Sequence, residues 1–273
     1  MPFMAYVIRR VLIWTKTYPE LSTRHIETVC TAGVLEDGSP VRLYPIQFRY
    51  LDSQFHKYQW ITAKIAKNPS DARPESHKVD PESIECGEIV PTTPDEWGKR
   101  AEIVFRNRSS QFDTMEQLLE AQKKARVSLG VVTPRKILNI SILQRGEEEA
   151  KNFEDKMARL RKQVDADRNQ LDLFEASIPP EMKRLDFLQS RARINWLCNS
   201  QDCGGHDMQI LDWEIAELQR RHGDQKALEK LREICNLENY ALRFFLGNLF
   251  QYPTSFTIVG LWYPKRQRDW LFS

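Results

Sequence analysis

Short runs rich in β-branched and aromatic residues dominate the first quarter of the chain. Such runs favour β-strands, and the Asp37-Gly38 pair between the second and third of them is typical of a hairpin turn. Several short strands at this spacing predict a small barrel or a curled sheet. The strands expected here cover residues 5–14, 27–35, 41–44 and 59–66.

Apolar residues recur at helical spacing in the middle of the chain. Residues 112–126 predict a helix that begins at a stretch resembling a capping box, Asp113 to Glu116. Residues 147–176 predict a long charged helix with a narrow apolar stripe, sustained for about three heptads. This stripe is typical of a solvated helix lying across the body of the protein, which we favour, or of an arm that docks a partner helix. Its members are Phe153, Met157, Leu160, Val164, Leu171 and Phe174.

The last third begins with a strictly alternating segment, residues 191–198. Alternation predicts a strand with one apolar face, formed by Ala192, Ile194, Trp196 and Cys198. The opposite face carries Arg191, Arg193 and Asn195. Beyond it the pattern predicts amphipathic helices and then two adjacent buried strands. The helices are expected over 207–221 and 226–239, and the strands over 240–247 and 256–264.

These elements predict an α+β protein. We expect an N-terminal small β-barrel of OB-like or similar type over residues 1–110. A helical connector carrying the charged, heptad-like arm follows over residues 111–180, and it includes two short strands within 128–143. A second α+β domain, with a Cys/Cys/His loop, is expected over residues 181–273.

Composition narrows the classes of partner. Forty Lys and Arg residues oppose 38 Asp and Glu residues, for a net charge of +2, so a nucleic-acid surface has to be a local patch. The five cysteines are an odd number and mostly far apart, which is not a disulfide framework and favours a reducing compartment. The chain has neither a signal-peptide core nor an apolar run long enough for a membrane span. We therefore expect a cytoplasmic protein without membrane contact.

The densest ligand chemistry lies just after the alternating strand. Cys198, Cys203 and His206 follow one another at Cys-x4-Cys-x2-His spacing, and a double glycine precedes the histidine. Two thiols and an imidazole suit zinc, whose structural sites take four ligands. Candidates for the fourth are Cys235, His222, Asp207, Asp212 or a water molecule. The alternative interpretation is a turn with two buried cysteines and a histidine that caps the next helix.

Basic and aromatic residues interleave around the third and fourth expected strands. This composition is typical of a groove that follows phosphates while bases stack on ring faces, although ordinary surface strands share it. We predict a nucleic-acid-binding patch, for DNA or RNA, that also includes the polar face of the alternating strand. Its residues are Arg42, Arg49, Lys57, Trp60, Arg73, Arg191 and Arg193.

A second candidate chemistry is metal-dependent hydrolysis at His206, Asp212 and Glu214. Residues two apart on a helix point about 200° apart, so Asp212 and Glu214 converge only if the helix is broken there. No phosphate-binding loop and no nucleophile motif is visible in the sequence. We predict no catalytic residue, and whether the protein is an enzyme stays open.

Six stretches carry a resemblance to known proteins: residues 12–19, 29–33, 41–45, 203–214, 245–248 and 258–264. In these stretches the chain resembles a group of uncharacterised bacterial proteins from defence-associated and mobile-element gene neighbourhoods. The first block is similar, more weakly, to proteins with two OB-like domains. The resemblance implies nucleic-acid binding, as a subunit or accessory of a defence or DNA-processing complex with other protein subunits. A protein–protein adaptor acting through the 153–174 helix is a further alternative.

Overall fold

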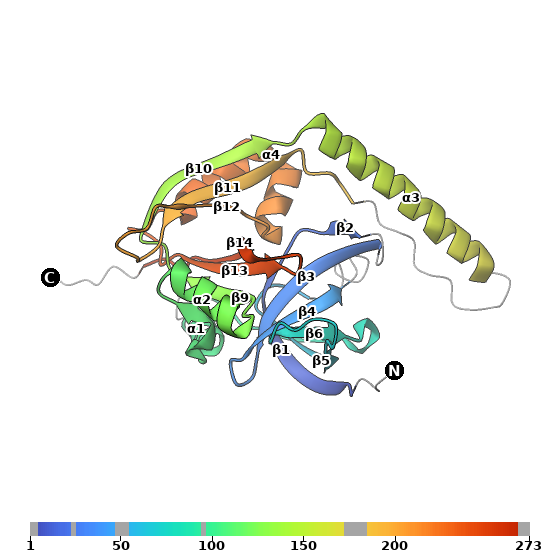
Figure 1. Cartoon of the computed structure of the whole chain (residues 1–273), viewed down its shortest axis with the longest axis horizontal. Helices are drawn as coiled ribbons and strands as arrows, with labels where there is room; N and C mark the ends of the chain where they lie inside the picture. Colours follow the sequence, from blue (N-terminus) through green and yellow to red (C-terminus); the bar gives the residue numbers. More distant parts are fainter. Residues whose placement is uncertain (1–4, 23–25, 47–54, 94–96, 172–184, 267–273) are drawn as a thin grey trace.

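The computed structural model describes residues 5–22, 26–46, 55–93, 97–171 and 185–266. Figure 1 shows a barrel that contains the N-terminal strands, two further sheets stacked above it, and a long helix that projects to one side. Arg49 and Phe174 lie outside the described residues, as do the side chains of Val164 and Leu171.

Five N-terminal strands close into a barrel in the order β1-β3-β4-β6-β5-β1. All neighbouring pairs are antiparallel except β4 and β6, which pair in parallel through Arg42 and Ser76. This order, with its third and fifth strands parallel, is that of an OB-like barrel, so the predicted fold class is confirmed. The strands are β1 (Val7–Lys16), β3 (Ile26–Leu35), β4 (Pro40–Ile46), β5 (Gln59–Lys67) and β6 (Ser76–Val79). Two strands lie outside the ring, β2 (Glu20–Ser22) beside β3 and β7 (Glu85–Ile89) beside β5.

The chain from residue 111 onward builds the two remaining sheets. Strands β8 (Gln111–Phe112), β9 (Leu129–Val132), β13 (Arg243–Leu249) and β14 (Tyr252–Trp262) form one sheet in the order β14-β13-β9-β8. Strands β10 (Lys136–Gln144), β11 (Ser190–Leu197) and β12 (His206–Gln209) form the other. The segment 111–180, predicted as a connector, thus supplies strands to both sheets. The helices are α1 (Gly98–Val104), α2 (Met115–Ala125), α3 (Glu147–Leu171) and α4 (Trp213–Ile234), with short 3-10 turns at Pro81–Ser83 and Arg108–Ser110.

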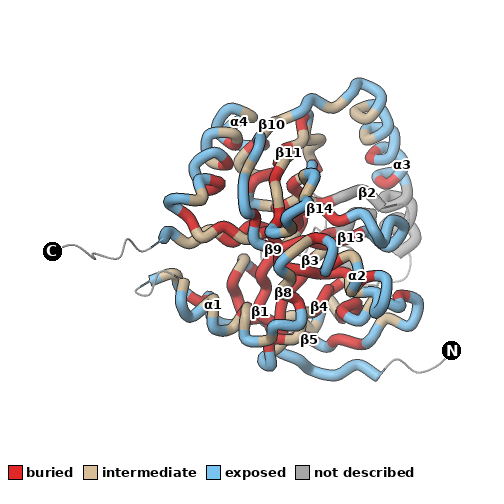
Figure 2. Tube along the Cα trace, turned by 60° about the vertical axis from the view of Figure 1, so that its left-hand side comes forward, coloured by how far each residue is buried: buried red, intermediate tan, exposed pale blue. Residues whose placement is uncertain are grey.

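The two halves share an apolar interface. Leu12, Trp14, Ala32 and Val34 on the outer face of the barrel form one buried cluster with residues of β9, β13 and β14. The rings of Trp14 and Phe245 lie 4.4 Å apart within this cluster. Figure 2 shows that buried positions concentrate along the strands, while the helices expose much of their surface. The outer face of β3 and β4, with which OB-like barrels bind oligonucleotides, is therefore covered by the chain's own C-terminal half.

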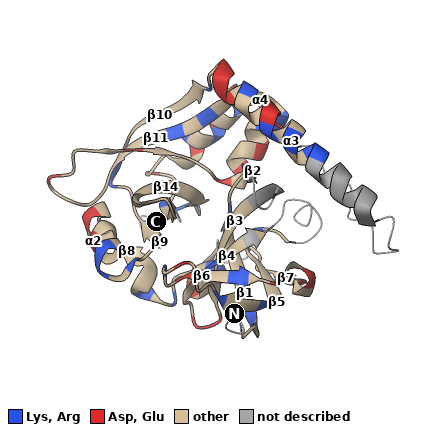
Figure 3. Cartoon of the chain, turned by 45° about the vertical axis from the view of Figure 1, so that its right-hand side comes forward, with Lys and Arg blue, Asp and Glu red and all other residues tan. Residues whose placement is uncertain are grey.

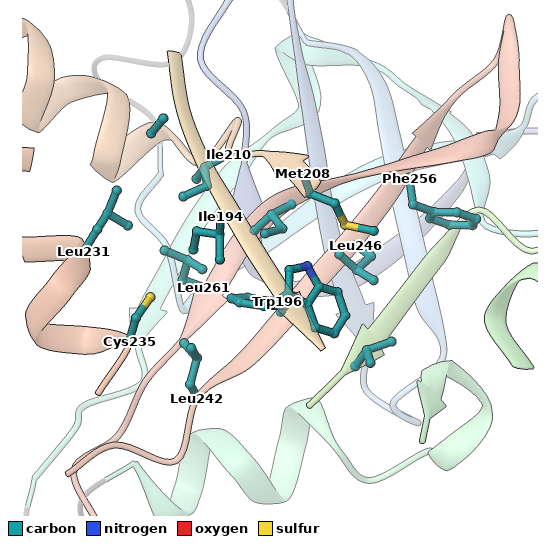
Figure 4. Packing of buried hydrophobic residues seen from close by; sticks show 14 of the residues in the cluster. Ile194, Trp196, Met208, Ile210, Leu231, Cys235, Leu242, Leu246, Phe256 and Leu261 are labelled. Carbon is teal, nitrogen blue, oxygen red and sulfur yellow. The ribbon is translucent and has the colours of Figure 1, made fainter. Parts of the chain in front are cut away.

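The alternating strand behaves as predicted. Ala192, Ile194, Trp196 and Cys198 are all buried in the C-terminal core, where the ring of Trp196 lies 5.0 Å from that of Phe244 on β13. Figure 4 shows Met208 and Leu246 next to Trp196.

The predicted start of the next helix was wrong. Residues 206–209 form strand β12, because they pair with β11 in a register that joins Trp196 to His206. Helix α4 begins at Trp213, and the side chain of Asp212 caps it by accepting hydrogen bonds from the backbone N–H groups of Glu214 and Ile215. Gly223, whose φ of 79° and ψ of 171° are not helical, divides α4 into two helical segments, so the predicted break between two helices is confirmed.

Helix α3 uses part of its apolar stripe against the body of the protein. Met157 and Leu160 are buried, and Met157 belongs to the same cluster as the barrel interior. The first half of the stripe is thus occupied within the chain, as expected for a helix lying across the body. No helix in the described ranges combines the length and the apolar character that a membrane span requires.

Candidate functional site

The structure brings Cys198, Cys203 and His206 together. Their ligand atoms, two Sγ and one imidazole nitrogen, all lie within 4.8 Å of one another, and Cys203 Sγ is 3.2 Å from His206 Nε2. Among the described residues no other group of three or more Cys, His, Asp or Glu side chains meets the same criterion. The three residues can bind a metal ion.

Local structure explains this convergence. Cys198 follows the last residue of β11, and His206 opens β12, the strand that pairs with β11. Gly205 adopts a φ of 99°, which lets the connecting loop reverse before His206. The backbone N–H of Cys198 donates to Cys203 Sγ across 3.4 Å, which holds the loop closed. The ring of His206 packs 4.9 Å from that of Trp196.

Burial sets the protonation of these groups. It lowers the pKa of His206, so the imidazole is neutral at neutral pH, the form that binds metal ions. It raises the pKa of the Cys198 thiol, because a thiolate is poorly solvated there. A bound cation would offset that cost.

The predicted candidates for a fourth ligand lie elsewhere. The thiol of Cys235 is buried in the apolar core beside Leu231 and Leu242 (Figure 4), and burial raises its pKa to about 12. Asp207 forms an ion pair with Arg193, and Asp212 forms one with Lys57. His222 lines a separate pocket together with Asp212.

Glu116, and none of these candidates, contacts the group of Cys198, Cys203 and His206. Its Oε2 lies 3.7 Å from Cys198 Sγ, across 82 positions of sequence. In the sequence Glu116 belongs to the predicted start of a helix, and no local spacing relates it to the cysteines.

The predicted nucleic-acid patch does not form a single surface. Arg42 is only 4% exposed and donates to the carbonyl of Ser128, because β9 covers this part of the barrel. Trp60 is 8% exposed and belongs to the interface cluster, with the guanidinium of Arg10 over its ring. These two positions were predicted to contact a ligand, and their burial removes them from that role.

The three other predicted arginines that the structure describes have acidic partners. Arg191 pairs with Glu149 at 2.5 Å and Arg193 with Asp207 at 3.0 Å, on the partly exposed face of β11. Arg73 pairs with Asp71 at 2.6 Å. Basic and acidic residues are also interspersed along α3 and α4, as Figure 3 shows.

Lys57 is the centre of a buried ion-pair cluster. Its Nζ lies 2.9 Å from both Asp212 Oδ2 and Glu214 Oε2. Burial alone would lower the pKa of Lys57, but the two carboxylates outweigh it and hold the pKa well above its usual value. The carboxylates converge because Asp212 precedes the helix, whereas a helix beginning at 207 would have separated them. They converge on a lysine and not on His206, so the predicted hydrolase triad is not assembled.

Exposed aromatic residues gather near Arg73. The tip of the β13–β14 hairpin carries Phe250 and Tyr252, each 62% exposed, next to the half-exposed Leu249. Phe250 lies under the guanidinium of Arg73, 5.6 Å from the ring centre, and Arg73 donates to the carbonyl of Asn248. Arg73 belongs to residues 68–75, the loop between the fourth and fifth barrel strands, so barrel and hairpin meet here. Arg73 is one of the residues predicted from the sequence, whereas the apolar pattern of the hairpin predicted only buried strands.

Comparison with known families divides the chain at the same point as the structure. Residues 7–106 match a domain of unknown function, DUF8758, and residues 111–273 match another, DUF8757. No curated protein matches the chain. Because the second match spans more than half of the sequence, the chain belongs to the DUF8757 family.

Proposed function

We propose that this protein binds single-stranded nucleic acid where the 68–75 loop of the barrel meets the tip of the β13–β14 hairpin. The observation that carries the proposal is the pair of exposed rings, Phe250 and Tyr252, beside Arg73. Proteins that bind single strands stack bases on such rings and contact phosphates with nearby cations.

The architecture supports the same surface. OB-like barrels bind oligonucleotides through the face of their second and third strands and through the loops after the first and fourth. In this chain the strand face is buried against the C-terminal half, as the burial of Arg42 illustrates. The loop after the fourth strand remains accessible, and the hairpin adds apolar area to it.

Local charge indicates how the ligand is held. Asp71 neutralises Arg73, so few cations are available for phosphates. We therefore expect stacking to dominate affinity and the salt dependence to be shallow.

Fluorescence anisotropy with labelled single-stranded DNA, single-stranded RNA and duplex DNA tests this proposal. The double variant Phe250→Ala, Tyr252→Ala should bind single strands at least about tenfold more weakly, given that stacking contributes about 1–3 kcal/mol per base. Tyr6→Ala is the matched control, because Tyr6 is also an exposed aromatic residue but precedes β1. Equal binding by the double variant, or no micromolar binding by the wild type at low salt, would overturn the proposal.

We also propose that the Cys198, Cys203 and His206 group holds zinc. Two thiolates and an imidazole form a borderline-soft donor set that suits Zn²⁺ better than Mg²⁺ or Ca²⁺. Metal analysis of the purified protein tests this assignment, with the expected result of one zinc per chain. Cys203→Ser should lose the metal. A wild-type protein that neither contains zinc nor takes it up after reduction contradicts it.

A further inference from the structure

We infer that Glu116 is the fourth ligand of this metal centre. The inference rests on the proposed zinc site and deepens it, because it decides whether the ion has an open coordination position. With Glu116 bound, all four ligands come from the protein and the centre is a closed, structural one.

The contact between Glu116 and Cys198 has the length expected in a tetrahedral site. Zinc–sulfur bonds of about 2.3 Å and zinc–oxygen bonds of about 2.0 Å put neighbouring ligand atoms about 3.5–3.8 Å apart. Glu116 Oε2 is 3.7 Å from Cys198 Sγ. On the other side of the group, Cys203 Sγ and His206 Nε2 are 3.2 Å apart, so these two atoms have to separate slightly to bind one ion. Glu116 does not belong to the group of ligand atoms that already converge, so its exposed side chain has to turn toward Cys203 and His206 to close the site.

Helix α2 holds Glu116 in position. Thr114 caps the helix by accepting from the backbone N–H of Gln117, one residue beyond Glu116. Met115 and Leu118, on either side of Glu116 in sequence, are buried in the same core cluster as Trp196 and Cys198. The backbone of Glu116 is thus anchored beside the cysteine loop, and only the side chain needs to turn.

Coordination by Glu116 would connect two parts of the fold that are distant in sequence. Cys198 and Cys203 would bind as thiolates and release their protons to water, while the Glu116 carboxylate and the neutral His206 complete the set. The ion would then join α2 to the β11–β12 connection. This arrangement also leaves no position for the metal-bound water that a hydrolase requires.

Cobalt titration of the metal-free, reduced protein tests the inference, because the absorption of bound Co²⁺ reports its ligand number and type. We compare the wild type with Glu116→Gln, which keeps the shape of the side chain but loses the charged donor. Glu120→Gln is the matched control, since Glu120 lies one turn further along α2 and pairs with Lys124. Affinities for Zn²⁺ follow from competition with Co²⁺, and melting of the metal-free proteins checks that α2 stays folded in each variant.

We expect Glu116→Gln to lower affinity by at least about tenfold, as even an outer-shell partner is worth 10–100-fold, and to change the cobalt spectrum. Glu120→Gln should match the wild type in both measurements. If the wild type binds metal and Glu116→Gln has the same affinity and spectrum, Glu116 is not a ligand and the zinc proposal stands alone. If the wild type binds neither ion, the zinc proposal fails and this inference fails with it.

Discussion

Lys57 Nζ lies 2.9 Å from Asp212 Oδ2, and this ion pair joins the N-terminal barrel to the first turn of helix α4. The two side chains are 6% and 2% exposed, so the pair is shielded from water. Asp212 also caps helix α4. Its carboxylate therefore both stabilises the start of the helix and binds the lysine of the other half. Glu214 supplies a second, half-exposed partner for the same ammonium.

Loss of Lys57 should therefore destabilise the protein strongly. Lys57→Met leaves Asp212 as a buried charge without its cation, a change that costs about 3–5 kcal/mol. Asp212→Asn should cost less, because asparagine still caps α4 and Lys57 keeps Glu214 as a partner. Urea denaturation measures the free energy of unfolding. Glu214→Gln is the control and should change it by about 0–1 kcal/mol, since Glu214 is 51% exposed.

The low pKa of Asp71 should make the free energy of unfolding depend on pH. Burial alone would raise its pKa, but hydrogen bonds from Arg73 and Ser76 lower it to about 2. A depressed carboxyl pKa stabilises the folded state above the unfolded value near 4, and this contribution disappears as the pH falls toward 2. The free energy of unfolding of the wild type should thus exceed that of Asp71→Asn by about 1–2 kcal/mol at pH 7. That difference should shrink below pH 4, and a constant difference from pH 7 to 2 contradicts the assignment.

The interface between the halves leaves no room at Gly260. A Cβ atom there would lie 2.6 Å from Thr15 Oγ1 and 2.8 Å from Thr15 Cβ, closer than packed atoms allow. Gly260→Ala should therefore push β14 away from β1 and cost about 1–3 kcal/mol. Gly146→Ala is the control, because nothing lies within 4 Å of its added Cβ. Denaturation midpoints compare the two variants, and equal midpoints would contradict the close approach.

Removal of the proposed zinc should loosen the C-terminal half. A ligand present at about 1,000 times its Kd stabilises by about 4 kcal/mol, which corresponds to roughly 10 °C in Tm for a protein of this size. Chelation under reducing conditions should lower the Tm by this amount, and added Zn²⁺ should restore it. Fluorescence of Trp196, whose ring packs against His206, should change with the metal. Cys235→Ala is a useful comparison, because it perturbs the same core but should leave zinc binding unchanged.

The pattern of apolar and polar residues predicted features that depend on a single strand or loop. The alternation over 191–198 identified both the buried face of β11 and the position of Cys198 at its end. The apolar runs near the N-terminus identified most of the barrel strands, and the spacing of Cys198, Cys203 and His206 identified residues that meet in space. The sequence pattern did not predict the four-residue strand β6, which closes the barrel, because so short a strand gives no periodic signal.

Other features depend on contacts between segments far apart in the chain. Residues 206–209 have a helix-compatible pattern, yet pairing with β11 extends them and moves the start of α4 to Trp213. That shift is the reason Asp212 and Glu214 converge on Lys57. The contact between Glu116 and Cys198 is a second example. The two residues lie 82 positions apart, and no sequence pattern relates them.

The sequence by itself thus determined which residues β11 buries and which three form the metal-binding group. Only the tertiary structure decided what covers the outer face of the barrel, and with it the burial of Arg42 and Trp60. The physical reason is that periodicity reports which side of an element avoids water. It does not report which distant segment packs against that side, and that partner decides whether a charged or aromatic residue meets solvent, a ligand or the core.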